Sequence, residues 1–358
     1  MQLSNNQLVF LELVRAGLWE KEARLLSFGE VDYNEVIRFA EMQSVDGLVT
    51  AGIEHIKDVK VPQEVILQSI GLSLQIEQRN QAMNNFIAEI VEKMRSVGIY
   101  TLLVKGQGVA QCYERPLWRP SGDVDFLLSE DNYKKARSFL LPLSSSNKKE
   151  ERYSQHLGMS IDSWYVEIHG SLRTGLSGRV DKEVDAVQRD VFYGGSVRSW
   201  NNGNTQVFMP APDNDVFFVF THFIKHFYKE GMNLRQICDW CRLLWTFKDT
   251  LNHDVLEKRI RRAGLMSEWK AFAALAVNYL GMPVEAMPLY DVRGKRDDVR
   301  WRKKAERILN HILKGEPYSK VRDTWAIAKI FPWNTCKYLP AIFFHLNWLK
   351  VKERLFLQ

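Results

Sequence analysis

Two aspartates separated by one residue, Asp123 and Asp125, are the strongest sign of chemistry in this sequence. They open an apolar stretch, residues 123–128, that predicts a β-strand. Strand alternation sends both carboxylates to one face and Val124 to the other. Neighbouring carboxylates repel each other, and a divalent cation that bridges them makes the arrangement favourable. Hard cations such as Mg²⁺ take oxygen ligands and usually bring phosphates with them.

A second predicted strand offers a third carboxylate. The alternation of residues 165–169 puts Glu167 and His169 on one face. If that face lies beside Asp123 and Asp125, three carboxylates converge. Such a site can hold two metal ions about 4 Å apart for phosphoryl or nucleotidyl transfer. We therefore predict Asp123, Asp125 and Glu167 as metal-binding and catalytic residues, with Mg²⁺ or Mn²⁺ as the cofactor.

Phosphate binding is expected around a turn that follows an apolar stretch, residues 99–104. The backbone N–H groups of a Gly-containing turn at Gly106 can approach phosphate closely. Cations at Lys105 and Arg119 would offset phosphate charge, although both residues also suit an ordinary surface position. His169 could contact phosphate, orient a ligand or complete a strand edge. The candidate nucleotide- and phosphate-binding residues are Lys105, Gly106, Gln107, Gly108, Arg119, Gly122 and His169.

A later helical segment carries polar residues that could line the same site. His222 and His226 are four residues apart and so share one helix face. They lie among phenylalanines, which equally favours a structural role. Arg235 and Asp239 have the spacing of an intrahelical ion pair. These residues are the possible site-lining residues His222, His226, Arg235 and Asp239.

The elements that position these residues fall into three parts. Residues 1–97 show helical spacing of apolar residues, with one helix predicted over 35–56 and a longer one from Pro62 towards Val97. Residues 98–212 alternate strand and helix, with further strands expected at 157–161 and 165–172. From 213 to 358 the pattern is helical again. We predict an α+β fold with domains 1–97, 98–212 and 213–358.

Composition narrows the class of protein. The 358 residues have 46% hydrophobic residues and a formal charge of +6, which is globular and mildly basic. No apolar run is long enough for a membrane span, and the first residues lack the pattern of a signal peptide. Four cysteines give no disulfide framework and favour a reducing, cytoplasmic location. The basic stretch 293–304 could bind RNA, but its interspersed aspartates favour a solvated helix face.

The segment from Leu102 to Leu128 resembles the nucleotidyltransferase superfamily of DNA polymerase beta. Members place a strand and a Gly-rich turn ahead of an Asp-x-Asp strand, and a third carboxylate on a later strand. More closely, the chain resembles a bacterial family known only as uncharacterised nucleotidyltransferases. The residues that match its pattern are Lys105-Gly106, Arg119, Gly122-Asp123-Val124-Asp125, Glu167-Ile168-His169 and, more weakly, His222, His226, Arg235 and Asp239. The resemblance implies a small mixed-sheet nucleotidyltransferase core between the helical regions.

We therefore expect an enzyme that binds an NTP and moves NMP to an acceptor by two-metal catalysis. The acceptor is left open among a small molecule, an RNA and a protein side chain, and the oligomeric state is also open. The alternative is a catalytically degenerate core that senses a nucleotide or binds a partner or RNA. Its motivation is the sequence Gly106-Gln107-Gly108, where the superfamily usually has Gly-Gly or Gly-Ser.

Overall fold

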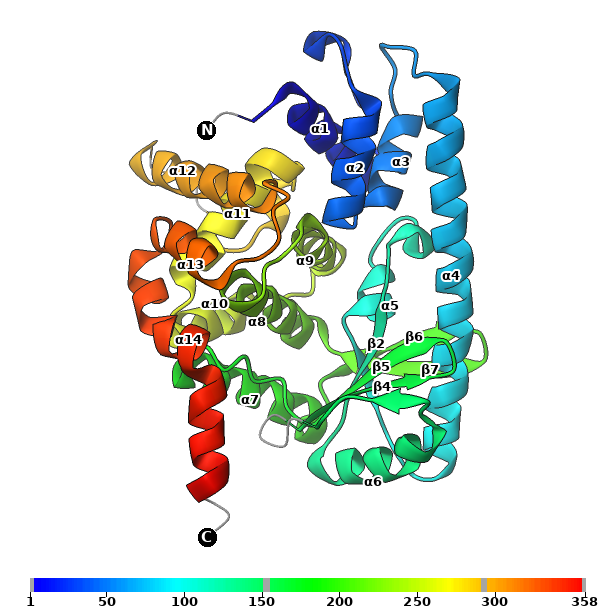
Figure 1. The fold of residues 1–358 in the computed structure, drawn as a ribbon, viewed down its shortest axis with the longest axis vertical. Coiled ribbons are helices and arrows are strands. Elements are labelled where there is room, and N and C mark those ends of the chain that lie inside the picture. Colours follow the sequence, from blue (N-terminus) through cyan, green and yellow to red (C-terminus); the bar gives the residue numbers. More distant parts are fainter. Residues whose placement is uncertain (1–2, 151–154, 291–294, 356–358) are drawn as a thin grey trace.

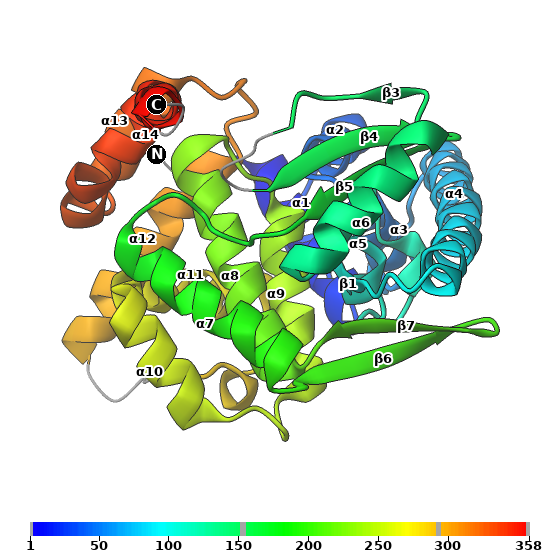
Figure 2. The ribbon, with the colours of Figure 1, turned by 90° about the horizontal axis from the view of Figure 1, so that it is seen from below.

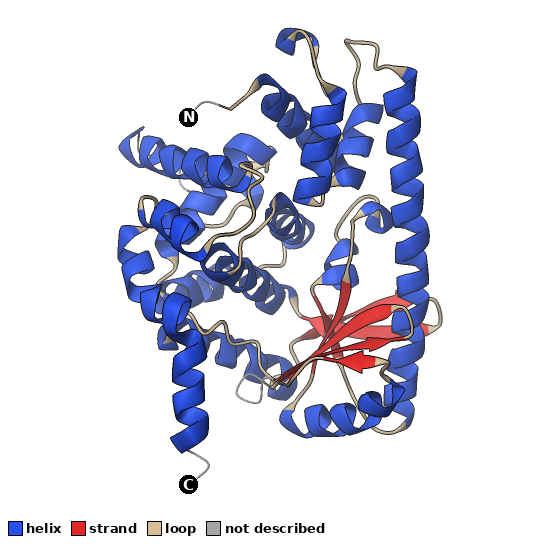
Figure 3. Cartoon of the chain, viewed as in Figure 1, coloured by secondary structure: helices blue, strands red, loops and turns tan. Residues whose placement is uncertain are grey.

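The computed structural model describes residues 3–150, 155–290 and 295–355 of the chain. Every strand in this described part lies between Leu102 and Pro210, and helices form both ends of the chain (Figure 3). The fold is α+β, with a small mixed sheet between helical N-terminal and C-terminal regions. This confirms the predicted fold class.

The N-terminal region is entirely helical. Its helices are α1 (Asn5–Trp19), the short 3₁₀ helix η1 (Leu26–Phe28), α2 (Tyr33–Gln43), α3 (Asp46–Glu54) and α4 (Gln63–Ser96). Helix α4 runs along one side of the molecule, from the N-terminal helices to the sheet (Figure 1). The single helix predicted over 35–56 is wrong, because Ser44 adopts a left-handed conformation with φ 53° and separates α2 from α3. Helix α4 begins directly after Pro62, as predicted.

Two glycines let α1 and α3 approach to backbone contact. A Cβ on Gly17 of α1 would lie 1.9 Å from the carbonyl oxygen of Leu48, and a Cβ on Gly52 of α3 would lie 2.1 Å from that of Leu13. Real Cβ atoms do not come this close to backbone atoms. The close packing of α1 against α3 therefore requires residues without a side chain at positions 17 and 52.

The described strands form a five-stranded sheet and a separate hairpin. The strands are β1 (Leu102–Val104), β2 (Asp123–Leu127), β3 (Ser146–Asn147), β4 (His156–Ile161), β5 (Trp164–His169), β6 (Val197–Asn202) and β7 (Thr205–Pro210). The sheet order is β1-β2-β5-β4-β3, with β2 and β5 parallel and the other pairs antiparallel. The hairpin of β6 and β7, which sequence analysis missed, lies beside α4 and β1 (Figure 2).

Short helices connect these strands. They are α5 (Gly106–Ala110), η2 (Pro116–Trp118), α6 (Glu130–Leu140) and η3 (Leu141–Leu143). The two faces of the sheet meet different hydrophobic cores. Val124, Phe126, Val166 and Ile168 pack with residues of α4 and α6 in the smaller core. Leu127 faces the opposite side, towards the larger core of the C-terminal helices.

The C-terminal region is a stack of helices. They are α8 (Pro212–Lys229), α9 (Leu234–Phe247), α10 (His253–Ala263), α11 (Met266–Leu280), η4 (Val284–Ala286), α12 (Lys295–Ile312), α13 (Lys320–Ala328) and α14 (Pro332–Leu355). Helix α7 (Gly178–Tyr193), which lies between β5 and β6 in the sequence, packs against α8 and α10. Fully buried aromatic rings of α8, α9 and α11 pack edge to face, among them Phe220, Trp240 and Trp269. Within the described ranges, none of the helices has the length and apolar content needed to cross a membrane.

The larger hydrophobic core contains residues from all three regions, including Phe10, Leu127 and Phe272. The N-terminal and C-terminal helices therefore pack into one body around the sheet. The division into domains 1–97, 98–212 and 213–358 stays a prediction. The basic stretch is described only from Lys295, where α12 begins, and Arg293 and Gly294 lie outside the described residues.

Replacing Gly52 with alanine is predicted to destabilise the protein by about 1–3 kcal/mol, because the added Cβ overpacks the contact with α1. This cost exceeds the roughly 0.5–1 kcal/mol by which alanine favours a helix over glycine. Gly71→Ala in α4 is the matched control, since its Cβ would meet nothing within 4 Å. The control should stabilise by about 0.4–1 kcal/mol. Urea unfolding followed by circular dichroism measures both, and equal effects would contradict the close packing.

Candidate active site

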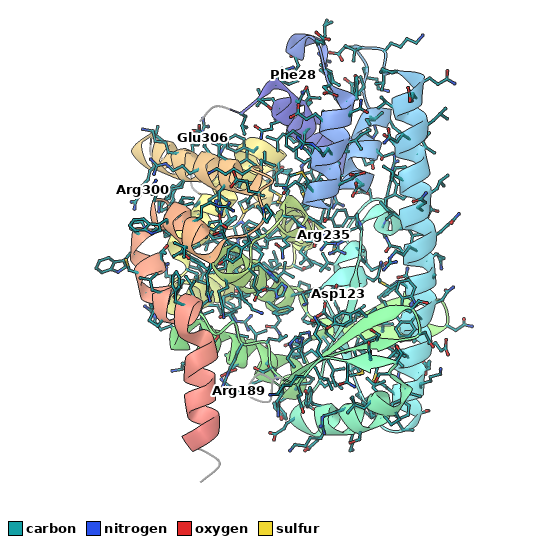
Figure 4. All side chains as sticks on the ribbon, in the orientation of Figure 1. Phe28, Asp123, Arg189, Arg235, Arg300 and Glu306 are labelled. Carbon is teal, nitrogen blue, oxygen red and sulfur yellow. The ribbon has the colours of Figure 1, made fainter. Side chains whose placement is uncertain are left out.

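The parallel pairing of β2 with β5 brings three carboxylates together. Asp125 lies directly opposite Glu167 in the register of the two strands, and Asp123 precedes Asp125 on the same face. One ligand oxygen from each of the three residues lies within 4.8 Å of the others. Figure 4 shows Asp123 on the side of the sheet that faces the C-terminal helices. The convergence that strand alternation predicted is therefore present in the fold.

Two cationic or hydrogen-bonding groups meet at Asp125, the most deeply buried of the three carboxylates. Lys105 Nζ and His169 Nε2 each lie 2.7 Å from Asp125 Oδ1. Burial by itself would raise the pKa of Asp125, but the contacts with Lys105 and His169 outweigh it and hold the pKa well below its ordinary value. Asp125 is therefore a carboxylate at any physiological pH.

Asp123 has the opposite electrostatic environment. The neighbouring carboxylate of Asp125 raises the pKa of Asp123, and burial adds to the rise. Gly122, just before it, borders open space, since a Cβ there would meet nothing within 4 Å. Of the three carboxylates, Asp123 is the one whose negative charge is least compensated by neighbouring groups. A cation bound here would relieve the repulsion between Asp123 and Asp125.

Lys105 reaches Asp125 through an unusual backbone conformation. Its φ is 59° and its ψ is −151°, at the residue that joins β1 to α5. Such a conformation costs a non-glycine residue about 1–3 kcal/mol and is typical of functional sites. Burial alone would lower the pKa of Lys105, but Asp125 and Asp123 keep it above its ordinary value. The lysine therefore carries a positive charge against the carboxylates.

The Gly-containing segment is the first turn of a helix rather than a free loop. Gly106, Gln107 and Gly108 belong to α5, which begins at Gly106 directly after Lys105. Gln107 is buried, and its Nε2 donates to Asn80 Oδ1 of α4 at 2.8 Å. Gly108 lies close to β7, because a Cβ there would be 2.9 Å from Met209 Sδ. The Gln107 side chain thus anchors this turn to α4.

His156 is a site residue that sequence analysis missed. It is the first residue of β4 and pairs with His169 across the two strands. The two imidazole rings stack, with their centroids 4.6 Å apart and their planes at an angle of 7°. His156 Nε2 lies 3.1 Å from Glu167 Oε2. Burial would raise the pKa of Glu167, but the contact with His156 outweighs it and lowers the pKa. The sequence pattern could have revealed His156. Because Leu157 and Met159 point into the core, strand alternation places His156 on the opposite, polar face.

Arg119 forms a buried ion pair with α9 instead of facing open solvent. Its Nε and Nη2 donate to Asp239 Oδ1 and Oδ2, each at 2.7 Å, and the Tyr113 hydroxyl donates to Asp239 Oδ1 at 2.8 Å. Burial by itself would lower the pKa of Arg119, but Asp239 raises it above its ordinary value. The intrahelical pair expected between Arg235 and Asp239 is replaced by this pair.

Arg235 and the two histidines of α8 lie around the same face. Arg235 Nη1 donates to the carbonyl oxygen of Pro120 at 2.7 Å, and Figure 4 shows Arg235 on the helical side of Asp123. The Nε2 atoms of His222 and His226 are 3.0 Å apart. Burial, followed by the charge of Lys105, lowers the pKa of His222 well below its ordinary value. His226 lines a cavity of about 400 Å³ between α8, α12 and α13.

The site thus combines a small mixed sheet, carboxylates on two adjacent strands and helices on both faces of the sheet. Residues 29–281 match the family described as uncharacterised nucleotidyltransferase, and the chain belongs to this family. No curated protein matches the chain. Among solved structures, an antigenic nucleotidyltransferase-like protein from Paracoccidioides brasiliensis is similar at 12% identity and a TM-score of 0.33. That similarity covers 56% of this chain and 93% of the other, and it is too distant to indicate a function.

Breaking the Arg119–Asp239 pair is predicted to be strongly destabilising. Arg119→Met would leave a buried carboxylate without its partner, which costs about 3–5 kcal/mol. The double variant Arg119→Met with Asp239→Leu should lose much less than the sum of the single changes, because neither charge is then left alone. Arg261→Met is the control, since its pair with Glu257 is exposed and contributes about 1 kcal/mol or less. Chemical denaturation measures all four, and additive losses would contradict a direct pair.

Proposed function

We propose that the protein is a metal-dependent nucleotidyltransferase that moves NMP from an NTP to an acceptor and releases pyrophosphate. The observation that carries this proposal is the cluster of Asp123, Asp125 and Glu167, whose ligand oxygens lie within 4.8 Å of one another. Membership of the nucleotidyltransferase family supports it independently. The relationship to the DNA polymerase beta superfamily remains a prediction based on the motifs.

The donor set suits a hard divalent cation. Three carboxylates face one lysine, so the cluster keeps an excess of negative charge, and the pKa of Asp123 rises as a consequence of the repulsion from Asp125. Oxygen ligands of this kind are those that Mg²⁺ and Mn²⁺ prefer. Asp123, Asp125 and Glu167 would hold the metal, which when bound supplies a positive charge that offsets the charge of the triphosphate.

The protein's own groups have distinct roles in this proposal. The acceptor hydroxyl oxygen attacks the α-phosphorus, the bond from that phosphorus to the pyrophosphate oxygen breaks, and the hydroxyl proton passes to the Glu167 carboxylate. The lowered pKa of Glu167 keeps the carboxylate ionised. Lys105 and the backbone of Gly106 to Gly108 would contact the phosphates beside Asp125.

Arg235 is a better candidate than Arg119 for a contact with phosphate. Arg119 uses its guanidinium on Asp239, whereas Arg235 Nε is buried without a hydrogen-bond partner among the described residues. Arg235 is also attracted electrostatically by Asp123. Arg119 and Asp239 would then act as positioning residues that hold the loop before β2 against α9.

The acceptor would bind in a cavity among the C-terminal helices, between α8, α12 and α13. The cavity of about 400 Å³ begins at His226, one helical turn from His222, and is lined mainly by polar residues. A small-molecule acceptor fits a cavity of this size. RNA and a protein side chain remain alternatives that an activity screen separates. The cytoplasmic location stays a prediction, and all cysteines in the described part of the chain are unpaired.

Asp123→Asn is predicted to separate stability from nucleotide binding. The change removes the carboxylate that is repelled by Asp125, so the metal-free protein should melt at the same or a higher temperature. Its affinity for Mg²⁺–NTP, measured by isothermal titration calorimetry, should fall at least about tenfold, which is roughly 1.4 kcal/mol. Intact-mass and pyrophosphate-release assays then measure transfer.

The matched control is Asp162→Asn, which removes an exposed carboxylate from the turn between β4 and β5. This variant should bind Mg²⁺–NTP as the wild type does. Equal binding by Asp123→Asn and the wild type would disprove the site assignment. Metal-dependent nucleotide binding without transfer to any acceptor tested would favour the nucleotide-sensing alternative.

A further inference from the structure

We infer that His156, Glu167 and His169 form a binding site for one transition-metal ion of the Zn²⁺ class, beside the three-carboxylate cluster. The site lies where β4 and β5 pair, with His156 opposite His169. It shares Glu167 with the proposed nucleotidyltransferase site, but it requires neither a nucleotide nor transfer activity.

The geometry fits such an ion. One ligand atom from each of the three residues lies within 4.8 Å of the others. Glu167 Oε2 is 3.1 Å from His156 Nε2 and 3.5 Å from His169 Nε2. Zinc binds imidazole nitrogen and carboxylate oxygen at about 2.0–2.2 Å, so two ligands of a tetrahedral ion are about 3.3–3.5 Å apart. The separation from His169 matches this value and the separation from His156 is slightly shorter. The two imidazole rings are stacked, so they would have to turn until both ring planes contain the ion.

The donors are available for a ligand. His156 Nε2 is buried and has no hydrogen-bond partner among the described residues, because its approach to Glu167 lacks hydrogen-bond geometry. A buried nitrogen that contacts a carboxylate at 3.1 Å without making a hydrogen bond is available to bind a metal ion. His169 Nε2 contacts Asp125 Oδ1, and this contact would be exchanged for the metal while Asp125 retains Lys105.

The chemistry of the donor set selects the class of cation. Two imidazoles and one carboxylate are the ligands of catalytic zinc sites, which keep a fourth position open. Imidazole favours Zn²⁺, Co²⁺ and related ions over Mg²⁺, which prefers oxygen alone. The polar face of the sheet would thus offer two neighbouring sites of different metal preference, joined through Glu167.

The other histidine pair in the described chain does not offer a comparable site. His222 Nε2 contacts His226 Nε2, and His226 uses its second ring nitrogen on Glu230, with Nδ1 at 3.0 Å from Oε2. The three groups form a chain along α8 in which His226 contacts a different neighbour from each nitrogen. His222→Gln is therefore a suitable control for zinc bound through α8.

The test uses the full chain, stripped of metal, without nucleotide. Zn²⁺ is titrated by calorimetry, and Co²⁺ is titrated by visible absorption, which reports four-coordinate geometry. The wild type should bind one ion per chain, and His156→Gln should lower the affinity at least about tenfold. His156→Asp, which retains a ligand atom, should recover part of the loss. His222→Gln should bind as the wild type does.

Three outcomes would overturn the inference. The first is the absence of Zn²⁺ and Co²⁺ binding by the wild type, or equal binding by His156→Gln. The second is a loss of binding that follows His222→Gln. The third is a thiolate-to-cobalt absorption band, which would assign the ion to a cysteine.

A further comparison distinguishes this inference from the proposed function. Asp123→Asn should lose Mg²⁺–NTP binding and retain Zn²⁺ binding, because Asp123 is not a ligand of the proposed zinc site. A wild type that binds Zn²⁺ but no Mg²⁺–NTP would disprove only the proposed function. A wild type that binds Mg²⁺–NTP but no Zn²⁺ would disprove only the present inference.

Discussion

The parallel pairing of β2 with β5 is the constraint on which the site depends. It places Asp125 opposite Glu167 on a face already occupied by Asp123, and so creates carboxylate repulsion that the fold must offset. Lys105 and His169 offset this repulsion at Asp125. At Asp123 part of the repulsion remains and raises the pKa of its carboxyl group. The apolar side chains on the opposite face hold the two strands in this register. A shift by one residue would move the carboxylates into the smaller hydrophobic core.

A second constraint connects the sheet to the C-terminal helices. The pair between Arg119 and Asp239 joins the loop before β2 to α9 across 120 residues of sequence. Arg235 reaches the same loop through the carbonyl oxygen of Pro120. These contacts fix the position of the loop before β2, and therefore the position of Asp123, the first residue of that strand. The long helix α4 covers the other face and anchors the first turn of α5 through Asn80.

Local patterns in the sequence predicted the strands of the site and its carboxylates, because alternation with period two places side chains on faces without knowledge of the partner strand. Features set by distant contacts were not predicted. The left-handed Ser44 that ends α2 has no local signal, and the partner of Arg119 lies in another region of the chain. The β6–β7 hairpin was overlooked although Gly203-Asn204, with φ 60° at the glycine, is a typical two-residue hairpin turn. His156 was missed because its strand begins one residue before the apolar stretch.

The central claim is that the three carboxylates on β2 and β5 bind metal and nucleotide together. A crystal structure with Mn²⁺ and a non-hydrolysable NTP analogue, with the metal located by its anomalous scattering, tests it most directly. The account predicts Mn²⁺ bound by Asp123, Asp125 and Glu167, with the triphosphate beside Lys105. Metal absent from these carboxylates, or a nucleotide bound away from this face of the sheet, would contradict it.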